Sequence, residues 1–341
     1  MALEKEEIEN LEFYISEYSS ELYNSYPIFF DNISYINSIA TYICSICLDF
    51  FEENETFVYE NDVDFITLIK YCEDITNSIG IEYKNIFQER LSDGTINFGF
   101  SKEGSIAYTS STEKHNDIFV DRNYTIEDII KTIHELFHEI HVCKFENKFK
   151  DQECYFYSEF VALIGDMYSI FYLYKNNILK KDCLTYFKKL FYSLNSIANT
   201  TLIEGITLDI YNKMQKLDEE SVLDYIKITN SPNEYSIIPE LNKQIGEYDY
   251  HICATYVFGF VFSFLISEAM IQDEFYLEKF KMIMKNINQY NFSDILLHFG
   301  IKGVLTDSDK LYSAVLHMYN ALESMKNKNE INIKASKGDL W

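Results

Sequence analysis

The chain has 341 residues, of which 47% are hydrophobic, which is enough to build a sizeable core in one large domain or two small ones. Its formal net charge of −25 argues against a nucleic-acid partner, because the phosphates would be repelled rather than neutralised. Seven cysteines at irregular spacing are typical of reduced thiols in a cytoplasmic protein rather than of a disulfide framework.

Residues 1–95 are predicted to form an N-terminal helical scaffold. The chain has only three prolines and eleven glycines, which favours long helices, and aromatic residues recur here at helical spacing, as core residues do. The first twenty residues are acidic and amphipathic, which does not match a secretory signal. Cys44 and Cys47 form a CxxC, but no second pair completes a metal site, so we interpret them as structural.

The pattern changes after residue 95. Residues 95–111 alternate between apolar and polar side chains and turn at Gly104, and a further apolar segment, DIFVD, follows a polar loop. This predicts a small antiparallel β-sheet immediately before the next helix. The edge strand of such a sheet can pair with an extended peptide through main-chain hydrogen bonds.

Residues 125–145 are predicted to form an amphipathic helix. Thr125 and Asp128 match a capping box at its start. His134, His138 and His141, one turn apart each time, share a face next to the buried stripe. The buried stripe comprises Ile126, Ile129, Ile130, Ile133, Phe137 and Ile140.

The pentad at residues 134–138 has the form HExxH. Two imidazoles one helical turn apart can bind one Zn²⁺, and Glu135, about 100° round the helix, can face a metal-bound water as a general base. A chance match on a solvated helix face is the alternative, but few chance matches fall on a capped amphipathic helix. We therefore predict a zinc site with His134 and His138 as ligands.

The third ligand is predicted to be Glu159, in the next helical segment. A carboxylate on an apolar helix is costly unless it is paired or metal-bound. Ala162, one turn further on, would let the two helices approach closely, and Asp166 is a candidate to orient a ligating imidazole. A charge at the rim of a half-exposed helix is the alternative for Glu159.

The C-terminal half is predicted to continue as helices. Residues 177–241 contain a polar loop punctuated by Pro232 and Pro239, and residues 251–267 form the longest uncharged run. That run is shorter than the ~20 residues that a bilayer span needs, so we predict a buried core helix and no membrane partner. Residues 326–341 form a polar tail.

Four blocks in this order resemble the catalytic core of the M3 peptidases, especially the oligoendopeptidase F branch. They span roughly residues 100–325 and read IFVDRNYTIEDIIKTIHELFHEIH, SEFVALIGD, HICATYVFGF and FSDILLHFGI. The resemblance implies zinc held by the histidine pair and the glutamate of the next helix, with the glutamate of the pentad as general base. It further implies that His251 and Tyr256 stabilise the oxyanion.

The sequence departs from that family at two positions. Phe137 stands where the family usually has glycine, which alters packing under the metal. The family also has a further tyrosine beyond Tyr256, where this chain has only phenylalanines, so Tyr248 or Tyr250 is an alternative donor to the oxyanion.

The sequence thus predicts a mainly α protein with a multi-helix, M3-type (gluzincin-like) catalytic core. The predicted domains are residues 1–95, 96–325 and 326–341. The predicted function is that of a cytoplasmic zinc endopeptidase, with one Zn²⁺ per chain, that cleaves short unstructured peptides. Two alternatives remain open: a maturation protease dedicated to one precursor peptide, and a catalytically silent peptide-binding protein on the same fold. The oligomeric state is not predicted.

Overall fold

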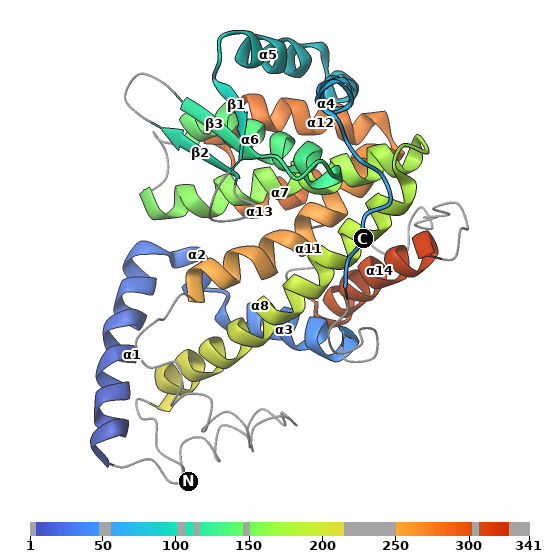
Figure 1. Ribbon diagram of the computed structural model, residues 1–341. Helices are drawn as coiled ribbons and strands as arrows, with labels where there is room; N and C mark the ends of the chain where they lie inside the picture. The colour runs from blue at the N-terminus through green and yellow to red at the C-terminus, as the bar shows by residue number, and fades with distance from the viewer. Residues whose placement is uncertain are drawn as a thin grey trace. The chain divides into compact units, whose positions relative to one another are not determined.

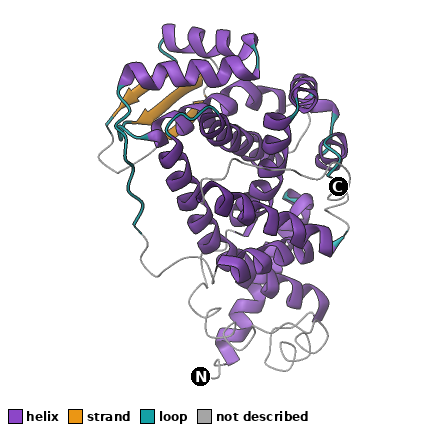
Figure 2. Cartoon of the chain, turned by 90° about the vertical axis from the view of Figure 1, so that its right-hand side faces the viewer, coloured by secondary structure: helices purple, strands orange, loops and turns teal. Residues whose placement is uncertain are grey.

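The protein is mainly α-helical, as predicted (Figures 1 and 2). We describe it from a computed structural model covering residues 5–47, 56–100, 107–111, 116–145, 151–214, 250–301 and 307–326. The N-terminal elements are α1 (Lys5–Ser25), α2 (Pro27–Phe30), α3 (Ile33–Cys47), α4 (Phe65–Ile79) and α5 (Ile81–Ser92). They are followed by β1 (Ile96–Gly99), β2 (Ala107–Ser111), β3 (Asn116–Asp121), α6 (Ile126–Phe145), α7 (Asp151–Lys175) and α8 (Lys180–Met214). The C-terminal elements are α11 (Tyr250–Gln272), α12 (Glu274–Lys285), the 3₁₀ turn η2 (Ile287–Gln289), α13 (Phe292–His298) and α14 (Ser308–Lys326).

The chain divides into two compact units, each built from two separate stretches of sequence. The first unit comprises Met1–Phe50 and Ser193–Phe258, and the second comprises Phe51–Tyr192 and Gly259–Trp341. Both α8 and α11 therefore contribute residues to each unit. The domain boundaries predicted at residues 95 and 325 remain predictions.

The sheet of the second unit directly precedes α6, as predicted, but only one of its two strand pairs is antiparallel. Its order is β1-β3-β2, in which β2 pairs with β3 antiparallel and β1 pairs with β3 parallel. The prediction of an antiparallel sheet is corrected in this respect. The reason is that β1 pairs with β3 and not with β2, the next strand along the chain. Because β2 runs opposite to both of them, β1 and β3 run in the same direction. The buried face carries Ile118 and Val120, and α6 packs against β2 and β3.

Helix α6 buries the stripe that its sequence predicts, since all six stripe residues are buried. Its start is fixed by Asp128, whose carboxylate accepts hydrogen bonds from the backbone N–H groups of Asn123 and Tyr124, both at 2.9 Å. Arg122 donates to the same carboxylate at 2.8 Å. The Thr125 hydroxyl accepts from the N–H of residue 127. Thr125 thus caps the first turn as predicted, whereas Asp128 binds the backbone N–H groups of two residues that precede the helix.

The α6–α7 contact shows how the chain accommodates Phe137. The ring is fully buried and stacks on Phe280, with centroids 6.2 Å apart. Opposite it stands Gly165 of α7, where an added Cβ would lie 3.2 Å from the ring of Phe137. The glycine at this contact is therefore Gly165 on α7, opposite Phe137 on α6, which occupies the position where the family that the sequence resembles usually has glycine.

Helix α11 is longer than its uncharged run suggested. It has 23 residues and is, among the described residues, the one helix that is long and apolar enough to cross a membrane. However, 78% of the most apolar 18-residue stretch of this helix is buried inside the protein. In the second unit, Ser263 and Ser267 donate to the carbonyl oxygens of Phe160 and Ile164 on α7, at 3.1 and 3.0 Å. This packing is that of a core helix.

Candidate metal centre

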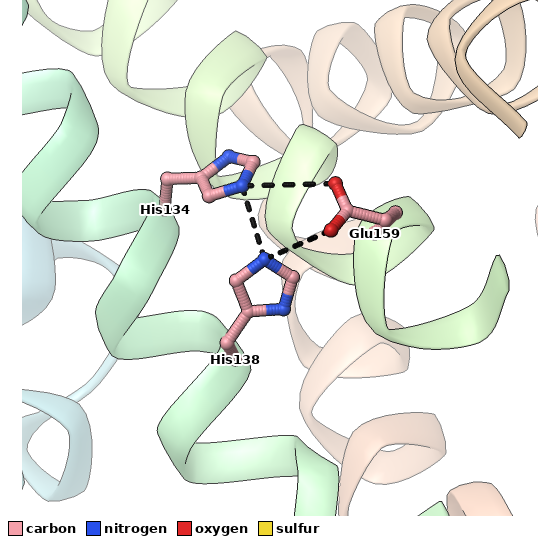
Figure 3. Close-up of side chains that lie close together, drawn as sticks. All are labelled: His134, His138 and Glu159. Atoms are coloured by element: carbon pink, nitrogen blue, oxygen red, sulfur yellow. Dashed lines mark hydrogen bonds and ion pairs between the residues drawn. The ribbon is translucent and has the colours of Figure 1, made fainter. Parts of the chain in front are cut away.

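Three predicted ligands converge between α6 and α7 (Figure 3). The Nε2 atoms of His134 and His138 lie 3.0 Å apart. Glu159 on α7 presents Oε1 at 3.5 Å from His138 Nε2 and Oε2 at 3.9 Å from His134 Nε2. The three side chains are 19%, 11% and 12% exposed, so the cluster is largely buried but still open to solvent.

The other ring nitrogen of each histidine has its own partner. His134 Nδ1 lies 3.0 Å from a carboxylate oxygen of Asp166, and His138 Nδ1 lies 2.6 Å from the hydroxyl of Ser158. A carboxylate can only accept, so His134 carries a proton on Nδ1, and the hydroxyl of Ser158 can accept from His138 in the same way. Both partners therefore leave Nε2 as the nitrogen available to bind a ligand.

This donor set fits Zn²⁺. With bonds of about 2.0–2.1 Å, two ligand atoms in a tetrahedral site lie about 3.3 Å apart, which is close to the separations found here. Two neutral imidazoles turned in this way would face each other with lone pairs, an unfavourable arrangement unless a cation lies between them. Two imidazoles and one carboxylate also leave a fourth position open, as in catalytic rather than structural zinc sites.

The charges around the cluster favour a shared cation. Burial opposes charge on His134, but the carboxylates of Asp166, Glu159 and Glu135 outweigh it and raise the pKa of His134 to about 10. Burial, together with the charge on His134, lowers the pKa of His138 to about 3. Without a metal, one proton is therefore held by the pair, and a metal ion has to displace that proton.

Glu135, the predicted general base, lies on α6 next to the first ligand. Its side chain is buried, and its carboxylate is close enough to raise the pKa of His134. By contrast, His141 does not join the cluster: it is buried against the rings of Tyr83 and Phe137, with centroids 6.1 and 5.8 Å away.

The structure describes His251 and Tyr256 in the first unit, whereas the cluster lies in the second. The two residues are five positions apart on α11, so their side chains point about 140° apart around the helix. Tyr250 is fully buried, which argues against it as a donor to a substrate, and Tyr248 lies outside the described residues. The oxyanion role of His251 and Tyr256 remains a prediction.

Sequence reasoning missed two groups of contacts. Ser158 directly precedes the third ligand, and its polarity within an apolar helix was a usable signal. Tyr18 and Tyr26 surround His251 in the first unit, yet residues 1–95 were interpreted as scaffold. No local pattern links Tyr18 to a histidine 233 residues away.

No protein-family model matches the sequence, and no curated protein matches it. Among solved structures, an X-ray structure of a protein assigned as an oligoendopeptidase F aligns over 86% of this chain with a TM-score of 0.58 and 13% identity. PZ peptidase A, solved with an inhibitor, aligns over 91% with a TM-score of 0.53 and 13% identity. The fold is therefore that of oligoendopeptidase F, which confirms the resemblance predicted from the motifs. The chain spans 58% of the length of each of these two structures.

Proposed function

We propose that the protein is a zinc-dependent endopeptidase that hydrolyses short unstructured peptides. The observation that carries the proposal is the cluster of His134, His138 and Glu159, with both imidazoles oriented to present Nε2 to one point. An oligoendopeptidase F fold supports it, because the structures that share this fold are peptidases by name.

The side chains divide the work of such a reaction. A bound Zn²⁺ would act as a Lewis acid that polarises the scissile carbonyl and acidifies water. Glu135 accepts the proton of the attacking water and passes it to the leaving amine. His251 and Tyr256 donate to the developing oxyanion, where loss of one donor typically lowers the rate on the order of 10²- to 10³-fold.

An extended peptide is the substrate that this scaffold suits. The strand order leaves β2 at an edge of the sheet, and α6, which carries the cluster, packs against β2 and β3. A peptide added along β2 would gain main-chain hydrogen bonds that do not depend on its sequence. The free thiols of Cys44, Cys72, Cys183 and Cys253 support a reducing compartment such as the cytoplasm.

Replacing Glu135 by glutamine tests the mechanism. The amide cannot accept the proton, so cleavage of a mixed peptide library, followed by mass spectrometry, should be abolished while zinc content and fold persist. Glu139→Gln is the matched control, since Glu139 lies one turn further along α6 and its carboxylate is bound by Arg90 at 2.9 Å. Undiminished cleavage by Glu135→Gln would refute the mechanism, and a wild-type protein that cleaves nothing would favour a peptide-binding protein. Cleavage of a single sequence would favour a dedicated maturation protease.

A further inference from the structure

Acidic residues outnumber basic ones in both units of the chain. The first unit has nineteen acidic and five basic residues, a formal charge of −14, and the second unit carries the remaining −11. A surface of one sign concentrates ions of the opposite sign around the protein and repels ions of its own sign. Because both units are acidic, a charged peptide meets a negative potential whichever unit it approaches.

Four basic side chains at α6 do not offset this potential toward a substrate. Each of them already pairs with a carboxylate of that helix: Arg90 with Glu139, Arg122 with Asp128, and Lys131 and Lys189 with Glu127. A carboxylate of a peptide would have to compete with these pairs for a cation. The surroundings of the helix that carries the cluster therefore suit basic peptides better than acidic ones.

The sheet beside α6 is acidic as well. Its strands contain Asp117 and Asp121 and no basic residue. Asp117 lies on β3 directly opposite Ser110 of β2. The next residue, Ile118, lies on the buried face, so Asp117 lies on the other face, where it is exposed. An exposed carboxylate thus lies one strand away from the edge along which we propose that the peptide binds.

The register of the sheet places one residue of such a peptide in line with this carboxylate. A peptide strand added to the free edge of β2 has a residue beside Ser110, on the same face as Ser110 and Asp117. Neighbouring strands lie about 4.8 Å apart, so this residue is about 10 Å from Asp117 along the row. Serine is short, and the long stem of a lysine or arginine can lean over it toward the carboxylate. An acidic residue at this position would instead face a like charge.

We propose that the protein selects peptides that carry lysine or arginine, and that Asp117 determines where along the peptide the basic residue lies. This inference rests on the proposed function, in which an extended peptide binds along β2. The acidic surface raises the local concentration of such peptides, and Asp117 adds an opposite charge at one position of the strand. The selection is therefore for charge and not for one particular sequence.

The wild-type protein loaded with zinc provides the first test. Short peptides would share one neutral background and differ in a single residue, lysine, glutamine or glutamate, which is moved along the chain. At about 0.01 M salt, kcat/KM should be about tenfold higher for lysine than for glutamate peptides, and the ratio should fall at about 1 M salt, where the Debye length is only about 3 Å. Equal values of kcat/KM for lysine and glutamate peptides at low salt would overturn the inference.

Asp117→Asn tests the position. It should lower the preference for lysine over glutamine by about 1.5- to fivefold at one position of the peptide and leave the other positions unchanged. Asp62→Asn is the matched control, because it removes the same charge from an exposed residue of the same unit that lies outside the sheet. Identical position profiles in the two variants would overturn the role of Asp117.

Binding separates this inference from the proposed function. If the wild type cleaves none of the peptides, the proposed function fails, and fluorescence anisotropy of the labelled lysine and glutamate peptides then decides whether the protein selects basic peptides. Tighter binding of the lysine peptide, weakened by salt, would support the selection, and equal binding would overturn it. The comparison in the wild type also decides if Asp117→Asn does not fold.

Discussion

The two imidazoles of the cluster have unequal partners, and this difference predicts unequal effects on metal binding. His134 Nδ1 faces the buried carboxylate of Asp166 at 3.0 Å, whereas His138 Nδ1 faces the neutral hydroxyl of Ser158 at 2.6 Å. A hydrogen bond to a charged group contributes about 1.5–3 kcal/mol and a neutral one about 0.5–1.5 kcal/mol. Asp166→Ala should therefore weaken Zn²⁺ binding about 13- to 160-fold, and Ser158→Ala only about 2- to 13-fold.

Asp166→Asn separates the charge from the hydrogen bond, because it preserves the shape of the side chain. The amide oxygen can still accept from Nδ1, so this variant loses the negative charge and should weaken Zn²⁺ binding less than Asp166→Ala does. Zinc affinity would be measured by competition with a fluorescent chelator of known affinity, with circular dichroism as the check on folding. Equal losses in Asp166→Ala and Ser158→Ala, or a wild-type affinity in Asp166→Asn, would refute the reasoning from charge.

Three further outcomes follow from the described contacts. Because the pKa of His134 is raised to about 10, the residue is protonated below this pH and a bound metal must displace its proton. The affinity for Zn²⁺ should therefore rise by about tenfold per pH unit below the pKa of His134. A chelator titration in which the affinity does not change with pH would contradict this prediction. Gly165→Ala places a Cβ 3.2 Å from the ring of Phe137. Overpacking costs about 1–3 kcal/mol, whereas replacing glycine by alanine in a helix gains about 1 kcal/mol in helix propensity. We therefore expect a lower midpoint of urea unfolding. An unchanged or higher midpoint would show that the ring of Phe137 moves to make room for the methyl group. Arg122→Met leaves the carboxylate of Asp128 buried without its cation and should lower the free energy of unfolding by about 3–5 kcal/mol. Little change in a urea titration would contradict this and would show that the backbone donors alone stabilise the carboxylate.

The sequence by itself determined the features that repeat with the period of a helix. The buried stripe of α6 and the spacing of His134 and His138 on one face follow from 3.6 residues per turn, which is a local property of the chain. The choice of Glu159 was possible because an acidic residue is conspicuous on an apolar helix. The position of the sheet ahead of α6 also followed from a local change of period.

The tertiary structure decided which distant groups meet. The parallel pairing of β1 with β3 arises because β1 lies beside β3 and not beside β2, its neighbour in the sequence. The glycine opposite Phe137, the hydroxyl of Ser158 on His138 and the phenol of Tyr18 on His251 are all contacts between different helices. Such contacts depend on how helices are stacked and rotated against each other, and periodicity fixes the face that a side chain shares but not the residue that it meets there.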